Sequence, residues 1–316
     1  MPRRGVAVSV LTSCLRGERY LTTFLACVAR QTIVDRIEVV LVHNAPTAAE
    51  LAIVRSFALE HPSLVRHLTV EQVEPLPVSW NRGIRSAVAD YLTIWNIDDL
   101  RTDDSLERQL GVLEGDPTAV ATYGDFIVVP TYGAKLGRLI SPSQYDPETF
   151  TLAYYGGCFP MWRRSVMRTA GLFDEQLPVV ADFDFFVRLA FNGPMRKTDG
   201  LLGYYLDAGQ GLSTRVGTPL YYERTLVERR YGMYANIDYR FYLGSRSFRR
   251  DEVLFAGDRH RIESLVPNYQ AVLKRRRKML VPGYLNFLAL MLRAAAGRLR
   301  RAAGAALTAS GSGRER

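Results

Sequence analysis

Apolar runs alternate with segments of helical periodicity along the first third of the chain. Residues 6–11 and 37–42 are continuous apolar runs, which are typical of strands buried on both faces of a sheet. The predicted order is strand 6–11, helix 21–28, strand 37–42, helix 48–60, strand 64–70, helix 79–89 and strand 91–97. This alternation predicts an α/β fold with a mostly parallel, doubly wound sheet flanked by helices. Ligands bind such sheets at the carboxyl ends of the strands, so the loops that follow the strands are the places to look for chemistry.

The middle of the chain continues the pattern less regularly. Leu106, Leu110 and Leu113 fall on one face of a helix that Gly115 closes. Further elements are predicted at 119–129 (strand), 159–162 (strand) and 181–191 (helix).

Composition and charge are those of a globular protein with a basic C-terminal end. The 316 residues are 47% hydrophobic and 23% charged, which excludes wholesale disorder. The three cysteines show no C-x-x-C spacing, so neither a disulfide framework nor a zinc cluster is expected, and the reducing cytoplasm is the expected location. The net charge of +9 is concentrated in residues 216–316, which hold 20 Lys and Arg against 8 Asp and Glu. No stretch reaches the roughly 18 uncharged apolar residues of a spanning helix.

Several common catalytic motifs are absent. The turn after the first strand has no G-x-G-x-x-G, and the chain has no G-x-x-x-x-G-K-[ST], G-x-S-x-G or H-E-x-x-H. The four histidines are widely scattered, which argues against a histidine-based metal site. Carboxylates at strand ends remain, and they suit a hard cation and phosphate oxygens.

Asp98 and Asp99 directly follow the predicted strand 91–97. Two adjacent carboxylates repel each other unless a cation or a hydrogen-bond donor lies between them. Mg²⁺ and Mn²⁺ are held by one or two carboxylates together with substrate phosphates. The alternative is a solvated turn whose aspartates cap the next helix.

Asp182 lies in a second acidic segment, at the start of the predicted helix 181–191. The helix dipole favours the ionised carboxylate at this position. Such a carboxylate, beside a metal-bound diphosphate, could take a proton from an attacking hydroxyl. The alternative is a simple helix N-cap.

Taken together, these segments resemble the family 2 inverting glycosyltransferases of the GT-A fold. The resemblance covers about residues 6–215 and rests on the order of five segments: 8–13, 38–44, 81–84, 91–99 and 171–189. It implies a GT-A type sheet in residues 1–215, with a nucleotide-binding part at about 1–115 and an acceptor part at about 116–215. Residues 216–316 would then form a helical, basic C-terminal extension.

The resemblance also implies roles for individual residues. Asp99 matches the metal-binding carboxylate, Asp98 its companion near the nucleotide ribose, and Asp182 the catalytic base. Thr12, Ser13, Asn44 and Asn81 match positions that line the nucleotide-sugar pocket. The implied cofactor is Mn²⁺ or Mg²⁺, and the implied reaction is a single in-line displacement at the anomeric carbon of a nucleotide sugar.

The chain departs from the family pattern at three places. His43 stands where an aspartate often helps to hold the base, and Cys14 replaces an aromatic that often stacks on it. The family frequently has a histidine after the helix of the catalytic base, and Asp207 is the residue nearest to that place. Asp207 is therefore a candidate third metal ligand.

The acceptor and the C-terminal tail are described by composition alone. The chain lacks the Q-x-x-R-W motif of processive synthases, so transfer of one sugar to a glycan or lipid-linked glycan of the cell envelope is expected. Aromatic residues that could face an acceptor are Tyr154, Tyr155, Phe159 and Trp162, although core packing is the better explanation for most of these rings. A basic cluster and an amphipathic pattern at 274–301 suit an anionic membrane surface on the inner face of the cell membrane; a helix docked on the domain is the alternative.

Two other functions remain open at this point. A nucleotidyltransferase that makes the sugar nucleotide would share the sheet and the metal, but it usually opens with a glycine-rich basic loop, and residues 12–17 hold one glycine. A catalytically inactive scaffold could instead bind membranes or polyanions through its tail. Nucleic acid is not an expected partner.

Overall fold

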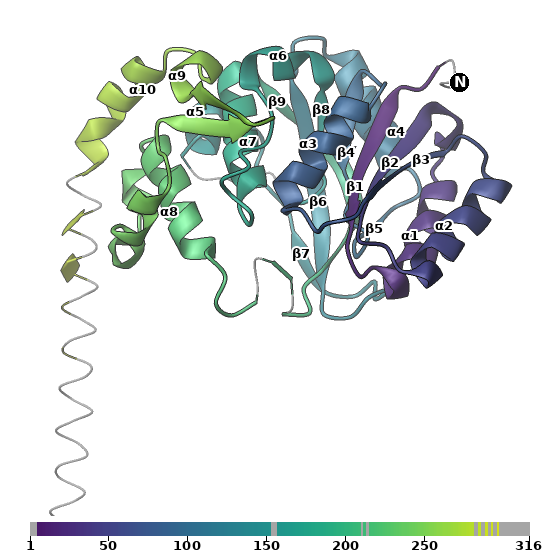
Figure 1. The fold of residues 1–316 in the computed structure, drawn as a ribbon. Coiled ribbons are helices and arrows are strands. Elements are labelled where there is room, and N and C mark those ends of the chain that lie inside the picture. Colours follow the sequence, from purple (N-terminus) through teal and green to yellow (C-terminus); the bar gives the residue numbers. More distant parts are fainter. Residues whose placement is uncertain are drawn as a thin grey trace, which may run out of the picture.

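A mixed nine-stranded sheet forms the centre of the computed structural model (Figure 1). The structure describes residues 5–152, 157–209, 211–212 and 215–280, together with residues 284, 285, 288, 289, 292 and 296. The strand order is β3-β2-β1-β4-β8-β6-β9-β5, with β7 paired to β6. The predicted α/β fold with a mostly parallel sheet is confirmed, because six of these strands run in one direction and β5, β7 and β8 run against them.

The N-terminal part follows the predicted alternation closely. Its elements are β1 (Val8–Cys14), α1 (Glu18–Ala29), β2 (Ile37–Asn44), α2 (Ala48–Glu60), β3 (Val65–Val70), α3 (Leu76–Ser86) and β4 (Tyr91–Ile94). All eight residues of β2 are buried, as a strand in the middle of a parallel sheet requires. Helix α2 begins at a capping box in which Thr47 and Glu50 satisfy each other's backbone N–H groups.

The predicted strand 91–97 ends three residues early. After Ile94 the chain turns, and the Trp95 indole donates a hydrogen bond to the carbonyl of Asp99 at 3.0 Å. Asp98 and Asp99 therefore lie in the loop between β4 and the next strand, which begins at Leu100.

The second half of the sheet contains a strand that the sequence pattern did not reveal. The elements are β5 (Leu100–Arg101), α4 (Ser105–Gly115), β6 (Ala121–Val129), β7 (Arg138–Ile140), α5 (Pro147–Phe150), β8 (Met161–Arg163), α6 (Met167–Ala170), α7 (Ala181–Asn192) and β9 (Met195–Leu206). Strand β9 runs parallel to β6 and carries the chain back toward the loop of Asp99.

Residues 220–280 pack on the side of the sheet away from α1 and α2 (Figure 1). They form α8 (Leu220–Arg230), the hairpin β10 (Glu252–Phe255) and β11 (Asp258–Arg261), α9 (Ile262–Leu265) and α10 (Tyr269–Arg276). Leu226, Tyr231 and Val253 belong to the same buried cluster as Phe185 of α7. This region therefore shares its hydrophobic core with α7.

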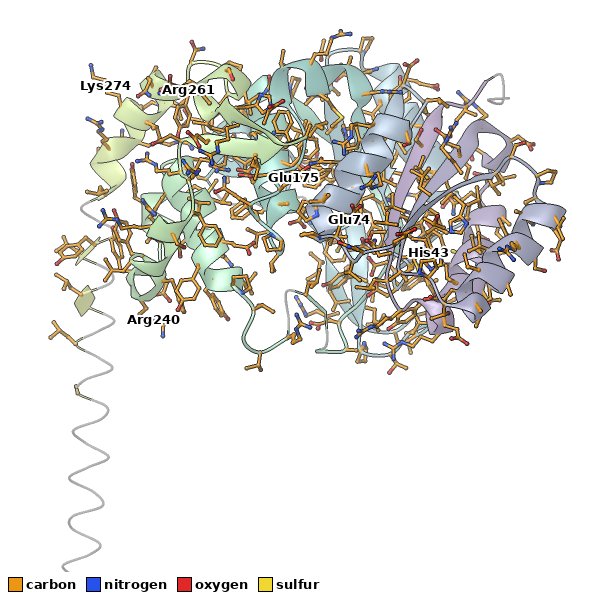
Figure 2. The ribbon with its side chains drawn as sticks, viewed as in Figure 1. His43, Glu74, Glu175, Arg240, Arg261 and Lys274 are labelled. Atoms are coloured by element: carbon orange, nitrogen blue, oxygen red, sulfur yellow. The ribbon has the colours of Figure 1, made fainter. Side chains whose placement is uncertain are left out.

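The basic run at 274–278 is only partly available to a partner. Lys274 is exposed at the outer side of this region (Figure 2), whereas Arg276 is buried and donates hydrogen bonds to backbone carbonyls of Thr151 and Tyr231. Most of the predicted amphipathic segment 279–301, like Tyr154 and Tyr155, lies outside the described residues. Among the described residues, no helix is long and apolar enough to cross a membrane.

Candidate active site

Asp99 is buried in the loop that follows β4, a central strand of the sheet. Its side chain is 1% exposed. The backbone N–H of Leu206, at the end of β9, donates to one carboxylate oxygen at 3.1 Å, and the Asn96 amide donates to the other at 3.3 Å. These two donors fix the direction of the carboxylate.

The electrostatics of the pair favour a bound cation. Burial raises the pKa of Asp99 well above its usual value, and the neighbouring charge of Asp98 raises it further. Burial also raises the pKa of Asp98. Among the described residues, neither carboxylate forms an ion pair within 4 Å. The nearby Arg101 guanidinium hydrogen-bonds instead to Gln109 and Thr93.

The backbone of β9 links Asp207 to the loop of Asp98 and Asp99. It follows Leu206, whose N–H contacts the Asp99 carboxylate, and its own N–H donates to the Val129 carbonyl at 2.9 Å. Its side chain is partly exposed and accepts a hydrogen bond from the Gly209 N–H at 3.3 Å. The three carboxylates offer only oxygen donors, the type that Mn²⁺ and Mg²⁺ prefer, but their ligand atoms do not all lie within 4.8 Å of one another.

Asp182 lies in the first turn of α7, as the sequence indicates. One carboxylate oxygen accepts a hydrogen bond from the Phe183 N–H at 2.8 Å. Burial raises the pKa of Asp182 to about 6, so burial outweighs the hydrogen bonds that favour the ionised form. The carboxylate is thus a base at neutral pH with an unusually high proton affinity.

Glu223 of α8 occupies the N-terminus of α7. One of its carboxylate oxygens accepts hydrogen bonds from the backbone N–H groups of Val179 and Val180, at 2.9 and 3.0 Å. Burial raises the pKa of Glu223 to about 7, and the charge of Asp182 contributes to the increase. Nothing in the local sequence pairs these two helices, so sequence reasoning missed this contact.

Asp99 and Asp182 both act on the thiol of Cys158. Burial raises the pKa of the Cys158 thiol, and the charges of Asp99 and Asp182 both raise it further. Cys158 lies just before β8, the antiparallel strand between β4 and β6. Two acidic segments that are far apart in the sequence therefore face a common region of the fold.

Thr12, Ser13 and Asn44 lie at the carboxyl ends of β1 and β2. The Asn44 amide donates to the hydroxyl groups of Ser13 and Ser79, at 3.3 and 3.0 Å. The Thr12 hydroxyl donates to the carbonyl of Trp95 at 2.9 Å, which links β1 to the loop of the acidic pair. The structure thus joins these polar residues to the loop of Asp98 and Asp99.

Asn81 has a different environment from the other predicted pocket residues. It is fully buried, its amide donates to the Phe173 carbonyl and to Glu175, and its oxygen accepts from the Phe173 N–H. These bonds tie α3 to the segment that precedes α7. Glu175 is labelled in Figure 2, as is Glu74 just before α3, which pairs with Arg82 at 2.8 Å.

A second acidic cluster lies beneath α7 and is matched by arginines. Arg230 of α8 contacts Asp174 at 2.9 Å and Asp184 at 2.6 Å, and Arg188 contacts Asp184 at 2.9 Å. All four side chains have no exposed surface. The sequence block around Asp184 suggested relatedness, but it gave no indication that a distant arginine completes the cluster.

Comparisons with known proteins agree with this fold. The family model of glycosyl transferase family 2 matches residues 9–171. A protein of Rickettsia felis described as an uncharacterized glycosyltransferase is 21% identical over 204 residues, which are 62% of this chain and 33% of that protein. The present chain therefore aligns with only a third of that relative's length.

Two solved structures share the fold. The S. aureus TarS fragment 1–349 in complex with UDP-GlcNAc has a TM-score of 0.58 and 17% identity, over 73% of this chain and 67% of that one. A Pyrobaculum calidifontis mannosyltransferase in complex with GDP-Man and Mn²⁺ has a TM-score of 0.50 and 19% identity, over 97% and 81% of the two chains. At these identities the likeness establishes the fold.

Proposed function

The chain belongs to glycosyl transferase family 2, and from this premise we propose that it transfers one sugar from a nucleotide-sugar donor to a hydroxyl group of an acceptor. We propose that the transfer inverts the anomeric configuration and depends on Mn²⁺ or Mg²⁺. The nucleotide sugars bound by the two proteins of similar fold support this class of donor, and the Mn²⁺ in one of them supports the cation.

One observation carries the proposal. The charges of Asp99 and Asp182 act on the same thiol, Cys158, although the two residues come from different segments of the chain. An inverting transfer needs a carboxylate near the leaving diphosphate and a second one near the attacking hydroxyl. The two acids meet that requirement.

Each proposed residue then has a separate task. Asp99, oriented by Asn96 and Leu206, would hold the cation together with Asp207, and Asp98 would face the ribose. A bound Mn²⁺ or Mg²⁺ would offset the negative charge on the leaving diphosphate. Asp182 accepts the proton of the acceptor hydroxyl as the new bond forms. Its pKa of about 6 leaves it deprotonated at neutral pH and basic enough to take that proton.

Thr12, Ser13, Asn44 and Asn81 complete the proposed donor site. The first three lie at the strand ends next to the acidic loop and would contact the nucleoside. Asn81 acts through the backbone, because its hydrogen bonds hold the segment before α7 against α3.

The donor is identified by testing a panel of UDP-, GDP-, CMP- and dTDP-sugars with Mn²⁺. We expect one donor to raise the melting temperature and to release its nucleotide, in a manner that EDTA reverses. Asp103→Asn serves as a control for substitution of Asp99 and should respond to the donor as the wild type does. Asp103 is close to Asp99 in the sequence, but its side chain is more than half exposed. A panel without any stabilising donor, at saturating Mn²⁺, would contradict the proposed function.

We propose a glycan or lipid-linked glycan of the cell envelope as the acceptor, reached from the inner face of the membrane. The exposed residues Lys274, Arg275, Arg277 and Lys278 support contact with anionic lipid. Flotation with anionic vesicles compares the wild type with a variant in which these four exposed residues are replaced by glutamine, while the buried Arg276 is kept. We expect the variant to lose most of the binding, and equal flotation of both would remove the membrane from the proposal.

A further inference from the structure

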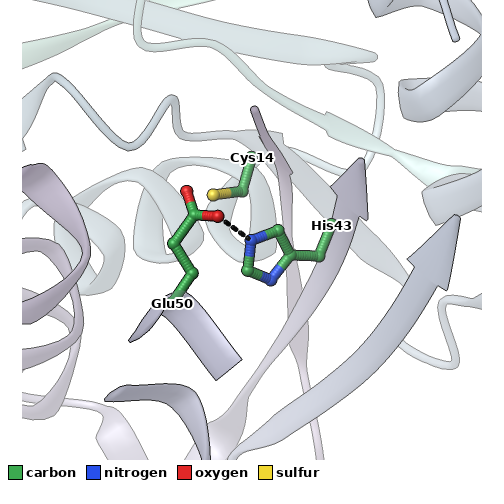
Figure 3. Close-up of side chains that lie close together, drawn as sticks. All are labelled: Cys14, His43 and Glu50. Atoms are coloured by element: carbon green, nitrogen blue, oxygen red, sulfur yellow. Dashed lines mark ion pairs between the residues drawn. The ribbon is translucent and has the colours of Figure 1, made fainter. Parts of the chain in front are cut away.

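Cys14, His43 and Glu50 bring a thiol, an imidazole and a carboxylate together at the carboxyl ends of β1 and β2 (Figure 3). Cys14 and His43 are partners in the parallel ladder between the two strands, and Glu50 comes from the first turn of α2. One ligand atom from each lies within 4.8 Å of the other two. All three side chains have no exposed surface.

One nitrogen of His43 is left without a partner. Nδ1 lies 3.1 Å from Nε2 of His67, which is hydrogen-bond distance. Nε2 is buried and, among the described residues, makes no hydrogen bond; it faces a carboxylate oxygen of Glu50 at 3.5 Å. A buried polar atom without a partner is unfavourable, and here it points into a cluster of potential ligands.

Glu50 presents a fixed negative charge to that nitrogen. Burial acts to raise the pKa of Glu50, but hydrogen bonds from the Thr47 and Gly17 N–H groups outweigh it, so the pKa lies below its usual value. These donors lie 2.8 and 2.5 Å from the two carboxylate oxygens. Among the described residues, no lysine or arginine pairs with Glu50. The pocket thus holds a buried carboxylate with a neutral thiol and an imidazole.

We propose that Cys14, His43 and Glu50 bind one Zn²⁺ ion, in a site separate from that of the catalytic cation at Asp99. Sulfur, imidazole nitrogen and a single carboxylate form a donor set for zinc, whereas Mg²⁺ prefers oxygen alone. Binding forms a zinc–thiolate bond and releases the Cys14 proton to solvent. These residues supply three of the four ligands of a tetrahedral site, and a water molecule would complete it.

The distance between the His43 nitrogen and the Glu50 oxygen matches the spacing expected around such an ion. With typical bond lengths, a tetrahedral zinc ion separates an imidazole nitrogen from a carboxylate oxygen by about 3.4 Å. The corresponding atoms of His43 and Glu50 lie 3.5 Å apart. The contact of His43 Nδ1 with His67 is the outer hydrogen bond that usually orients a ligating histidine.

No motif in the sequence predicts this site. The three ligands come from three elements with no recognisable spacing, and only the β1–β2 register brings Cys14 beside His43. The ion would join the ends of β1 and β2 to the start of α2, directly beside Ser13 and Asn44.

The test uses the full-length chain with Co²⁺ as a spectroscopic substitute for Zn²⁺. We expect one metal ion per chain, a thiolate-to-cobalt charge-transfer band and the visible bands of tetrahedral Co²⁺. Cys14→Ser should lose the charge-transfer band, and His67→Gln should weaken Zn²⁺ binding by about 10–100-fold while keeping the band.

Two variants serve as controls. Cys27 is equally buried but lies outside the cluster, so Cys27→Ser should keep the band. Asp99→Asn should also keep it, which separates this site from the catalytic cation. Absence of the band in the wild type, or its survival in Cys14→Ser, would overturn the proposal. If Cys14→Ser does not fold, X-ray absorption of the zinc-loaded wild type decides, because a shell with no sulfur is incompatible with the site.

Discussion

The two buried acidic clusters of this protein differ in what balances their charge. Arg230 contacts both Asp174 and Asp184, and Arg188 also contacts Asp184. The positive charges hold the pKa of Asp184 below its usual value even though it is buried, whereas burial still raises the pKa of Asp174. Asp98 and Asp99 have no such partner within the described residues, and burial raises the pKa of both.

We propose that the difference separates a structural cluster from a functional one. A buried carboxylate that is paired and hydrogen-bonded supports the fold, whereas one without a countercharge is retained at a cost in stability. Strongly shifted carboxylates near one another are candidates for chemistry. The clusters should therefore respond in opposite ways to substitution.

The largest effect is expected for Asp182→Asn. Asparagine keeps the shape of the side chain but cannot accept the proton of the acceptor. We expect turnover to fall by about 10²–10⁴-fold with donor binding retained. Steady-state kinetics and donor-induced thermal shifts measure the two separately.

The pH profile supplies the control for this assignment. With the pKa of Asp182 near 6, the wild-type rate should decline as the pH falls below about 6, because the base becomes protonated. Residual activity of Asp182→Asn should lack this decline. A variant with wild-type turnover would assign the base to another residue.

Arg230→Ala should cause the largest loss of stability. The substitution leaves Asp174 and Asp184 buried with Arg188 as the remaining arginine of the cluster. It also removes hydrogen bonds to the carbonyls of Arg249 and Glu252. Breaking a buried ion pair typically costs about 3–5 kcal/mol. Urea denaturation measures the free energy of unfolding, and the exposed Arg240, which pairs only with Asp238, is the matched site for a control alanine.

Asp99→Asn should act in the opposite direction on the free protein. Removing an unpaired buried charge should leave the free energy of unfolding unchanged or raise it by about 1 kcal/mol. The same variant should lose the stabilisation that Mn²⁺ and donor confer on the wild type, about 2.7 kcal/mol at a ligand concentration of 100 times Kd. A marked loss of stability without ligand would place Asp99 with the structural cluster.

Glu223→Gln should have the smallest effect. The folded protein binds a proton at Glu223 with a pKa of about 7, whereas the unfolded chain does so only near 4.3. The wild type should therefore gain stability from this residue as the pH falls from 8 to 6, by up to about 1 kcal/mol. The variant should lack that gain, as chemical denaturation at the two pH values would reveal. Identical pH dependence of both proteins would contradict the assignment.

The parallel half of the fold was predictable because its signals are local. The helix expected at 48–60 coincides with α2, where the capping box defines the start and apolar spacing the length. Strand β9 was missed because its sequence mixes Arg196, Asp199 and Gly200 with apolar residues. Its pairing with β6 also shifts register near Gly124, so no simple alternation survives.

The candidate site was predictable where one segment carries the signal. Asp98, Asp99 and Asp182 stand out in their own segments, and the structure brings Asp99 and Asp182 to the same thiol. Arg230 and Glu223 could not be found in this way. They come from α8, and only tertiary packing brings them to α7.

The contact between Glu223 and α7 links the protonation of two carboxylates. The carboxylate of Glu223 accepts the backbone N–H groups of Val179 and Val180 at the positive pole of the helix. Asp182 lies in the first turn of the same helix, and its charge raises the pKa of Glu223. The ionisation of Asp182 therefore affects a residue contributed by a remote helix, although none of the hydrogen bonds described for either side chain joins the two.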